Sequence, residues 1–282
     1  MMSSAELVGA GVISTEHTEI RMTIDPTGTL ALWGSTNRPG GAGGWDLWMS
    51  RRANASSSWG EALPAPINSA ARDFDPAFSP DGSELYFFSD RPGGTGGDDL
   101  YRVAVSSAGF GEVQALGPEI NSAGDEWAPA LSPDGATLLF ASDGRGGAGR
   151  HDLFVARRNE DGSGWQVAAA VPGDLNTPED EFDATFLMDG SSLVFARSKN
   201  VEEAPISLYF AQPRNDRYPS GTPISDRVNV EGGATRGPAQ SWHDRDVLLF
   251  TGRREEKTMG SMDLYEIRYR LIDVSSLTRE AQ

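Results

Sequence analysis

A ten-residue pattern recurs along this chain and constrains its fold more than any other feature. In the clearest copy, residues 73–82, an acidic and apolar segment ends in Ser-Pro-Asp-Gly and is followed by the apolar run 85–88. Related copies occupy 126–135 and 181–190, and eroded ones contain residues 25–28 and 243–245. The turn positions Gly28, Gly82, Gly135, Gly190 and Arg245 are spaced by 53 to 55 residues. A fixed period of this size, with several short strands per unit, is typical of a β-propeller.

Each repeat predicts four strands. In the second repeat these are strand A at 74–78, strand B at 85–88, strand C at 100–105 and strand D at 110–116. The A–B turn follows known turn chemistry, because Pro presets φ and Gly accepts a positive φ that other residues resist. We therefore predict an all-β chain that forms one five-bladed β-propeller of four-stranded blades.

The blade boundaries follow from the repeat. We predict blades at residues 13–66, 67–119, 120–174, 175–228 and 229–270. The last blade lacks a fourth strand, and residues 5–10 resemble the segment that precedes the next repeat. We expect this N-terminal segment to complete the last blade, which removes exposed sheet edges. Six blades would require a shorter repeat than the one observed.

Composition excludes several classes of function. A net charge of −17 argues against nucleic acid, which requires clustered Lys and Arg. The absence of Cys excludes disulfides, thiolate catalysis and Cys-bound zinc. No apolar run reaches the ~18 residues of a membrane span. The start Met1-Met2-Ser3-Ser4 fits a cytoplasmic protein as written, or a periplasmic or envelope protein whose signal was removed. We expect a monomer.

The repeats resemble the TolB-like, WD-type propeller repeat family of bacteria. The resemblance rests on residues 75–82, 129–135 and the Asp-Leu-Tyr of strand C at 99–101, while 35–41 and 89–94 look like outer-envelope members. It implies protein–protein or envelope-associated binding, because the family has no shared catalytic motif. TolB itself has six blades and an extra domain, so its activity is not carried over. Here Leu187-Met188 replaces Ser-Pro, and Arg245 replaces the turn glycine.

Two rows of residues on strand A are the candidate site. Strand A begins on the face that collects the long loops, and loops on a rigid scaffold tend to carry function. The outer row, nine residues before each turn position, consists of Glu19, Asp73, Glu126, Glu181 and Arg236. The second row, seven residues before it, consists of Arg21, Asp75, Ala128, Asp183 and Pro238. Two-residue steps predict that both rows lie on one side of strand A.

Each row has two interpretations. An acidic residue at one place in four blades indicates a scaffold device that accepts hydrogen bonds from a neighbouring loop. Arg21 and Arg236 become neighbours when the ring closes, and such a pair binds a carboxylate or phosphate. The alternative is an internal salt-bridge network with Asp75 and Asp183. The B–C loops add two further candidate binding residues, Arg38 and Arg91.

No cofactor is expected, although residues 90–99 or 143–152 are candidates for calcium without the EF-hand spacing. The glycine runs of these loops are not phosphate loops, because no helix follows them. His17, His151 and His243 fall at different blade positions, so we predict surface histidines and no His-based metal site.

We favour a non-catalytic binding or scaffolding propeller that recognises a protein, peptide or glycan. The alternative is a furanosidase-like hydrolase, since five-bladed folds also host such enzymes. Asp75, Glu126 and Asp183 would then supply nucleophile, acid and base, with two carboxylates about 5–9 Å apart. Against it, these carboxylates follow the repeat rather than breaking it.

Overall fold

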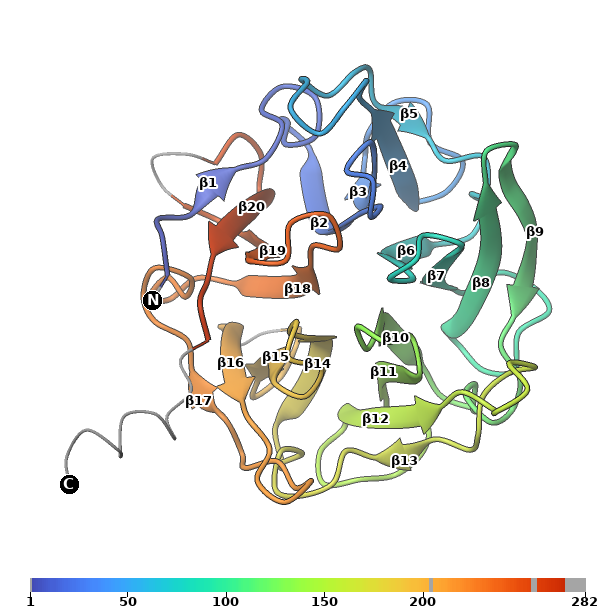
Figure 1. Cartoon of the computed structure of the whole chain (residues 1–282), viewed down its shortest axis with the longest axis vertical. Coiled ribbons are helices and arrows are strands. Elements are labelled where there is room, and N and C mark those ends of the chain that lie inside the picture. The colour runs from blue at the N-terminus through green and yellow to red at the C-terminus, as the bar shows by residue number, and fades with distance from the viewer. Residues whose placement is uncertain (1, 203–204, 255–257, 272–282) are drawn as a thin grey trace.

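The computed structural model is a ring of five four-stranded antiparallel sheets (Figure 1). It describes residues 2–202, 205–254 and 258–271. These residues form strands β1 to β20 and contain no α-helix. The prediction of an all-β, five-bladed β-propeller is therefore confirmed. No helix in the described part of the chain is long and apolar enough to cross a membrane.

The five sheets follow the sequence repeat. Blade 1 contains β2 (Thr18–Ile24), β3 (Leu30–Thr36), β4 (Trp45–Arg51) and β5 (Leu63–Pro64). Blade 2 contains β6 (Asp73–Phe78), β7 (Glu84–Ser89), β8 (Asp99–Ser106) and β9 (Gly109–Ala115). Blade 3 contains β10 (Glu126–Leu131), β11 (Thr137–Ser142), β12 (Asp152–Arg157) and β13 (Ala169–Ala170). Blade 4 contains β14 (Asp180–Phe186), β15 (Leu193–Ser198), β16 (Ser207–Ala211) and β17 (Thr222–Pro223). Blade 5 contains β18 (Thr235–Gln240), β19 (Val247–Gly252), β20 (Asp263–Arg268) and β1 (Glu6–Leu7).

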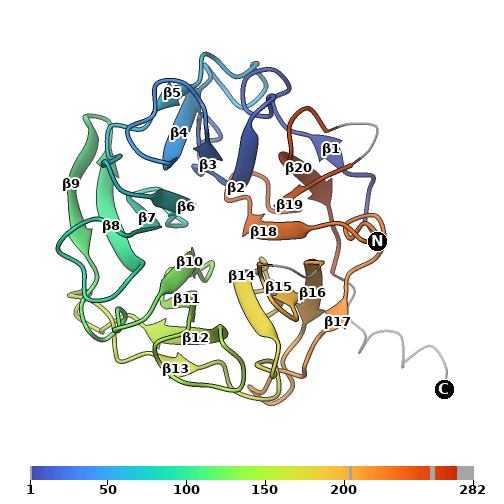
Figure 2. The ribbon, with the colours of Figure 1, turned by 180° about the vertical axis from the view of Figure 1, so that it is seen from behind.

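The N-terminal strand closes the ring. Glu6 pairs with Glu266 and Leu7 with Tyr265, so β1 is the fourth strand of blade 5 (Figure 2). The amide of Val8 extends this pairing by donating a hydrogen bond of 2.9 Å to the carbonyl of Leu264. The predicted closure is confirmed, and it joins the first strand of the chain to the last.

The Ser-Pro-Asp-Gly turns are held by side-chain hydrogen bonds. The hydroxyl of Ser79 donates to Asp81 Oδ1 at 2.6 Å and accepts from the amide of Glu84 at 2.9 Å. Asp81 Oδ1 also accepts from the amide of Ser83, and these bonds lower the pKa of Asp81. Gly82 has φ 73°, the left-handed conformation that this turn requires. The motif is therefore a self-contained turn between β6 and β7.

Each inner strand carries a β-bulge. The innermost strands β2, β6, β10, β14 and β18 surround the axis (Figure 1), and each one shifts register after its first residues. The residues at the shift have φ between 43° and 57°, and they are Arg21, Asp75, Ala128, Asp183 and Gly237. A bulge breaks the simple alternation of faces. Two-residue steps therefore do not by themselves place both rows on one side of the strand.

Blade 5 is offset by one residue from the predicted rows. Thr235 pairs with Gly252 in the way that Glu126 pairs with Ser142, so Thr235 completes the outer row. The cause is a longer turn. The amide of Ser241 donates to the carbonyl of Val247, six residues later, whereas in blade 2 the amide of Ser79 donates to the carbonyl of Glu84, five residues later. Counting back nine residues from Arg245 therefore stops one residue short of the outer row. Arg236 is not in the outer row, and Gly237 rather than Pro238 belongs to the second row.

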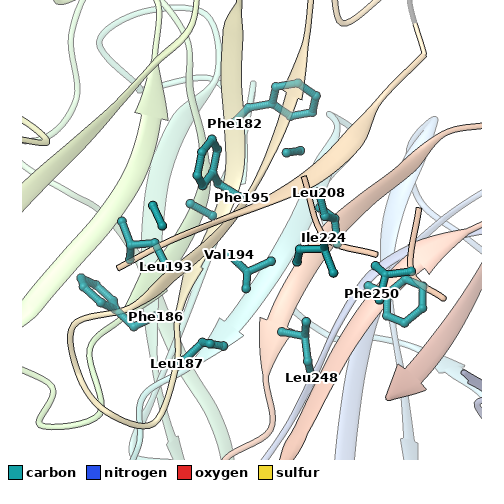
Figure 3. Close-up of a cluster of buried hydrophobic side chains, with 14 of the residues drawn as sticks. Phe182, Phe186, Leu187, Leu193, Val194, Phe195, Leu208, Ile224, Leu248 and Phe250 are labelled. Carbon is teal, nitrogen blue, oxygen red and sulfur yellow. The ribbon is translucent and has the colours of Figure 1, made fainter. Parts of the chain in front are cut away.

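The core lies between the blades. Middle strands such as β15 and β19 are buried along their whole length. Figure 3 shows the cluster formed by blades 4 and 5, in which Phe195 and Phe250 are fully buried. Full burial of such a side chain stabilises the fold by about 1.5–3 kcal/mol.

A repeated amide clamps each blade to the linker that follows it. Asn121 Oδ1 accepts from the amide of Leu100 at 2.9 Å, and its Nδ2 donates to the Leu100 carbonyl at 3.1 Å. The same pair of bonds joins Asn68 to Leu47, Asn176 to Leu153 and Asn229 to Leu208. The hydroxyl of Ser14 takes this place on Leu264. These clamps fix where the next inner strand starts.

Candidate channel-mouth site

The outer-row carboxylates bind the loop that precedes them. Glu126 accepts from the amide and hydroxyl of Ser122, four residues earlier, at 2.7 and 2.5 Å. Glu19 receives the same two bonds from Thr15, Asp73 from Ser69 and Glu181 from Thr177. All four carboxylates are fully buried, and burial raises the pKa of Glu19 to about 7. This is the arrangement that the scaffold interpretation predicts.

The two B–C loop arginines also lie within the scaffold. Arg91 Nη2 is 2.5 Å from Asp73 Oδ1, and its guanidinium lies 5.0 Å from the ring centre of Phe87. Arg38 Nη1 is 3.9 Å from Glu19 Oε1, and its guanidinium stacks 4.6 Å from the ring of Trp48. Both guanidinium groups pack on aromatic rings of their own blade and pair with the outer row.

Arg21 crosses the channel. Its side chain is 1% exposed, and Nη2 donates to the carbonyls of Pro129 at 2.9 Å, Ala184 at 3.2 Å and Ala128 at 3.4 Å. Arg21 belongs to blade 1, whereas its acceptors belong to blades 3 and 4. The guanidinium therefore connects three blades across the axis.

Whereas Arg21 contacts backbone carbonyls, Arg236 pairs with a carboxylate. Its Nε lies 3.5 Å from Asp183 Oδ2, and its guanidinium lies 5.3 Å from the ring of Phe182. Asp183 Oδ2 also accepts from the amide of Gly237 at 3.0 Å. The contacts of both arginines thus run within the ring, as in the internal-network alternative.

Asp75 is the most perturbed carboxyl of the channel. Burial, followed by the charge of Asp183, raises the pKa of Asp75 to about 8, and the charges of Arg21 and Arg236 oppose the shift. Its Oδ1 has no hydrogen-bond partner among the described residues. Burial therefore favours the protonated form of Asp75.

The three carboxyls assigned to the hydrolase alternative are all engaged or buried. Glu126 also accepts from the hydroxyl of Ser142 at 2.7 Å, and burial raises its pKa. Asp183 is held by Gly237 and Arg236, and Asp75 is 3% exposed. None of the three is a free carboxylate facing solvent.

A layer of aromatic rings lies next to the outer row. Phe74 and Trp127 are the second residues of β6 and β10, and both are half-buried. Ring centres are 4.5 Å apart for Trp45 and Phe74, 5.5 Å for Phe74 and Phe88, 6.4 Å for Phe88 and Trp127, and 4.1 Å for Trp127 and His151. We call these five residues the mouth layer. It runs across blades 1 to 3.

A charged pair borders the mouth layer. Arg72 Nη2 lies 2.7 and 2.6 Å from the two oxygens of Asp98, and Trp127 Nε1 donates to Asp98 Oδ2 at 2.7 Å. The Arg72 side chain is 43% exposed, whereas Asp98 is buried. Asp98 therefore orients both the indole of Trp127 and the exposed guanidinium of Arg72.

His151 corrects the prediction of surface histidines. It is fully buried, with Nδ1 3.4 Å from Asp180 Oδ1 and Nε2 4.0 Å from Asp143 Oδ2. The sequence analysis also missed Trp45, Arg72 and Asp98 as residues of the mouth. For Trp45 and Asp98 the sequence did contain a signal, because the residue just before or at the start of strand C differs in every repeat. This position is occupied by Trp45, Asp98, His151, Ile206 and Met262.

The described residues contain no group of three or more acidic or histidine side chains placed to hold a metal ion. The loops proposed for calcium are closed by amide donors. Asp99 Oδ2 accepts from the amides of Thr95 and Gly96, and Asp152 Oδ2 accepts from that of Gly149. The other oxygen of each carboxylate, Oδ1, is buried without a hydrogen-bond partner among the described residues, so calcium at these loops stays a prediction.

Comparison with known proteins gives the fold. No protein-family model matches the sequence, and no curated protein matches it. The solved structure of a putative TolB from Agrobacterium tumefaciens matches with a TM-score of 0.54 and 18% identity, covering 93% of this chain and 78% of that one. TolB from Acinetobacter baumannii matches with a TM-score of 0.50 and 13% identity, covering 90% of this chain. The chain resembles TolB-like propellers in fold.

Other solved structures match equally well. A calcium-binding protein, regucalcin, from A. tumefaciens str. C58 has a TM-score of 0.53 and 17% identity, with 96% of each chain covered. An endo-arabinase from Bacteroides thetaiotaomicron has a TM-score of 0.52 and 10% identity, covering 96% of this chain and 99% of that one. The chain spans 55% of the A. baumannii TolB. At these identities the likeness shows the fold alone.

Proposed function

We propose that this chain is a non-catalytic binding propeller that recognises a protein, peptide or glycan partner on its mouth layer. One observation carries the proposal: the half-buried rings of Phe74 and Trp127 lie beside an outer row whose carboxylates are all engaged. The chemistry left for a partner is therefore aromatic surface with a bordering guanidinium.

The half-buried rings of the mouth layer, Trp45, Phe74 and Trp127, have the properties of a recognition surface. Aromatic side chains supply large contact areas, and the indole N–H of Trp127 is held in place by Asp98. The side chain of Arg72 is 43% exposed, and the same carboxylate holds its guanidinium in place. Pre-oriented aromatic and arginine side chains are the usual anchors of binding sites, because little conformational freedom is lost on binding.

The hydrolase alternative has less support. A glycosidase needs one carboxyl to give up or accept a proton and another to act on the sugar or on water. Here Asp75 is buried, and Glu126 and Asp183 each accept hydrogen bonds from their own scaffold. The structural likeness to an endo-arabinase carries no activity to this chain.

Binding to peptide and oligosaccharide arrays, followed by titration of each hit, tests the proposal. Phe74→Ala should weaken a genuine hit at least tenfold, because it removes an aromatic anchor. The matched control is Val167→Ala, which shortens a 72% exposed apolar side chain on the outer part of blade 3. Hits whose affinity is unchanged by Phe74→Ala and by Trp127→Phe would contradict a mouth-layer site.

A further inference from the structure

The channel centre is lined by oxygen atoms of the inner-strand bulges. The carbonyls of Ala128, Pro129 and Ala184 lie at the register shifts of β10 and β14, where the regular strand pairing is interrupted. All three accept from one atom, Nη2 of Arg21. We call the five residues at the inner-strand bulges the bulge ring: Arg21, Asp75, Ala128, Asp183 and Gly237. Two of them, Asp75 and Asp183, carry carboxyl groups.

This surrounding suits a compact positive charge better than a guanidinium fork. Arg21 uses Nη2 for three oxygens, whereas its Nε and Nη1 are buried without a hydrogen-bond partner among the described residues. A guanidinium is normally chosen for its planar fork, which contacts a flat partner through two nitrogens. Several oxygens gathered around a single atom are instead typical of a small, hard cation.

The charges around the channel centre also favour a bound cation. Buried carbonyl and carboxylate oxygens without a nearby positive charge would be costly, because the protein interior solvates them poorly. Arg21 is the basic residue of the bulge ring, whose other members are Asp75, Ala128, Asp183 and Gly237. We infer that the channel centre is a cation-binding site, ligated by oxygen, that this chain fills with its own Arg21.

The inference concerns the channel centre and does not depend on the mouth layer. It predicts that a variant without the guanidinium will accept a cation from solution. The test variant is Arg21→Ala, and the readout is the melting temperature with and without added CaCl2 or methylguanidinium chloride. NaCl at equal ionic strength corrects for screening. EDTA should reverse the calcium effect.

The matched control is Arg145→Ala. Arg145 also donates to backbone carbonyls, at Ile120 and Pro118, but it lies in a half-exposed loop. Its removal leaves oxygens that water can reach, so no selective effect of a cation is expected. Arg21→Lys is a second variant, because an ammonium group offers three donors around one atom. It should melt closer to the native protein than Arg21→Ala does.

We expect either cation, at a hundredfold excess over its dissociation constant, to raise the melting temperature of Arg21→Ala by roughly 5–10 °C. Adding Asp75→Asn should reduce this rise. If Arg21→Ala does not fold in plain buffer, recovery of folded protein on refolding with the cation is the equivalent readout. The inference is overturned if neither cation affects Arg21→Ala more than it affects the native chain and Arg145→Ala.

Discussion

The buried carboxyl of Asp75 makes a quantitative prediction about stability and pH. Its pKa is 3.8 as a free side chain and about 8 in the folded chain. Between these values the folded state keeps a proton that the unfolded state has released. The stability that this proton contributes is therefore fully present below pH 4, and it is lost as the pH rises toward 8.

The magnitude follows from the linkage. One proton bound only by the folded state changes the free energy of unfolding by about 1.4 kcal/mol per pH unit. Between pH 5 and pH 7 the Asp75 carboxyl should therefore lower the free energy of unfolding of the native protein by about 3 kcal/mol. The Asp75→Asn variant has no such carboxyl, and Asn tolerates the φ of 51° at this position.

The assay is urea denaturation of both proteins at pH 5, 6, 7 and 8. The stability of Asp75→Asn relative to the native chain should increase with pH by about 3 kcal/mol over the first two units. Titrating groups that do not interact with Asp75 cancel in this difference. Asp161→Asn is the control, because Asp161 is an exposed loop residue and its removal should give a flat difference. Parallel pH profiles for the native chain and Asp75→Asn would refute the reasoning.

Three further predictions concern the scaffold and can be checked by thermal and urea unfolding. Deleting residues 2–8 removes β1, and it should lower stability by about 3–5 kcal/mol because blade 5 loses its fourth strand; unchanged unfolding would show that closure is not needed. Gly34→Ala should cost about 1–3 kcal/mol, since the new methyl would lie 2.5 Å from a Phe ring of blade 2, whereas Gly44→Ala meets nothing within 4 Å and should be nearly neutral. Asn121→Ala should cost on the order of 3 kcal/mol, because the buried amide of Leu100 loses its acceptor; a loss below 0.5 kcal/mol would argue against the clamp.

The repeat was sufficient to predict the architecture. A period of 53 to 55 residues, with apolar strands on both sides of each turn, leaves few alternatives to five blades. Closure by residues 5–10 was also predictable, because the last repeat lacks a fourth strand. These features depend on pattern and spacing, which the sequence shows directly.

The rows of the site were predicted less well, for two local reasons. Periodicity assumes regular strands, but the inner strands contain bulges at residues such as Asp75 and Ala128. The turn of blade 5 is one residue longer, which displaced Arg236 and Pro238 by one position. Neither a bulge nor a single added turn residue changes the hydrophobic pattern enough to be detected.

The long-range partners could not be read from the sequence. Arg21 was expected at an anion, but its acceptors are carbonyls more than a hundred residues away. The burial of His151 likewise depends on Trp127, Asp143 and Asp180, which come from other strands and loops. Such contacts follow from the closed ring and not from local spacing.

The pairing of β1 with β20 also determines the order in which the molecule can be completed. β1 is synthesised first, but its partner strand contains Tyr265 and Glu266, near the other end of the described chain. Blades 1 to 4 contain all their strands before β20 exists, so they can assemble during synthesis. Blade 5 must wait, and forming contacts so distant in sequence is slow. Until then blade 5 has an unpaired edge, and this interval is when the chain is most exposed to proteolysis and to pairing with other chains.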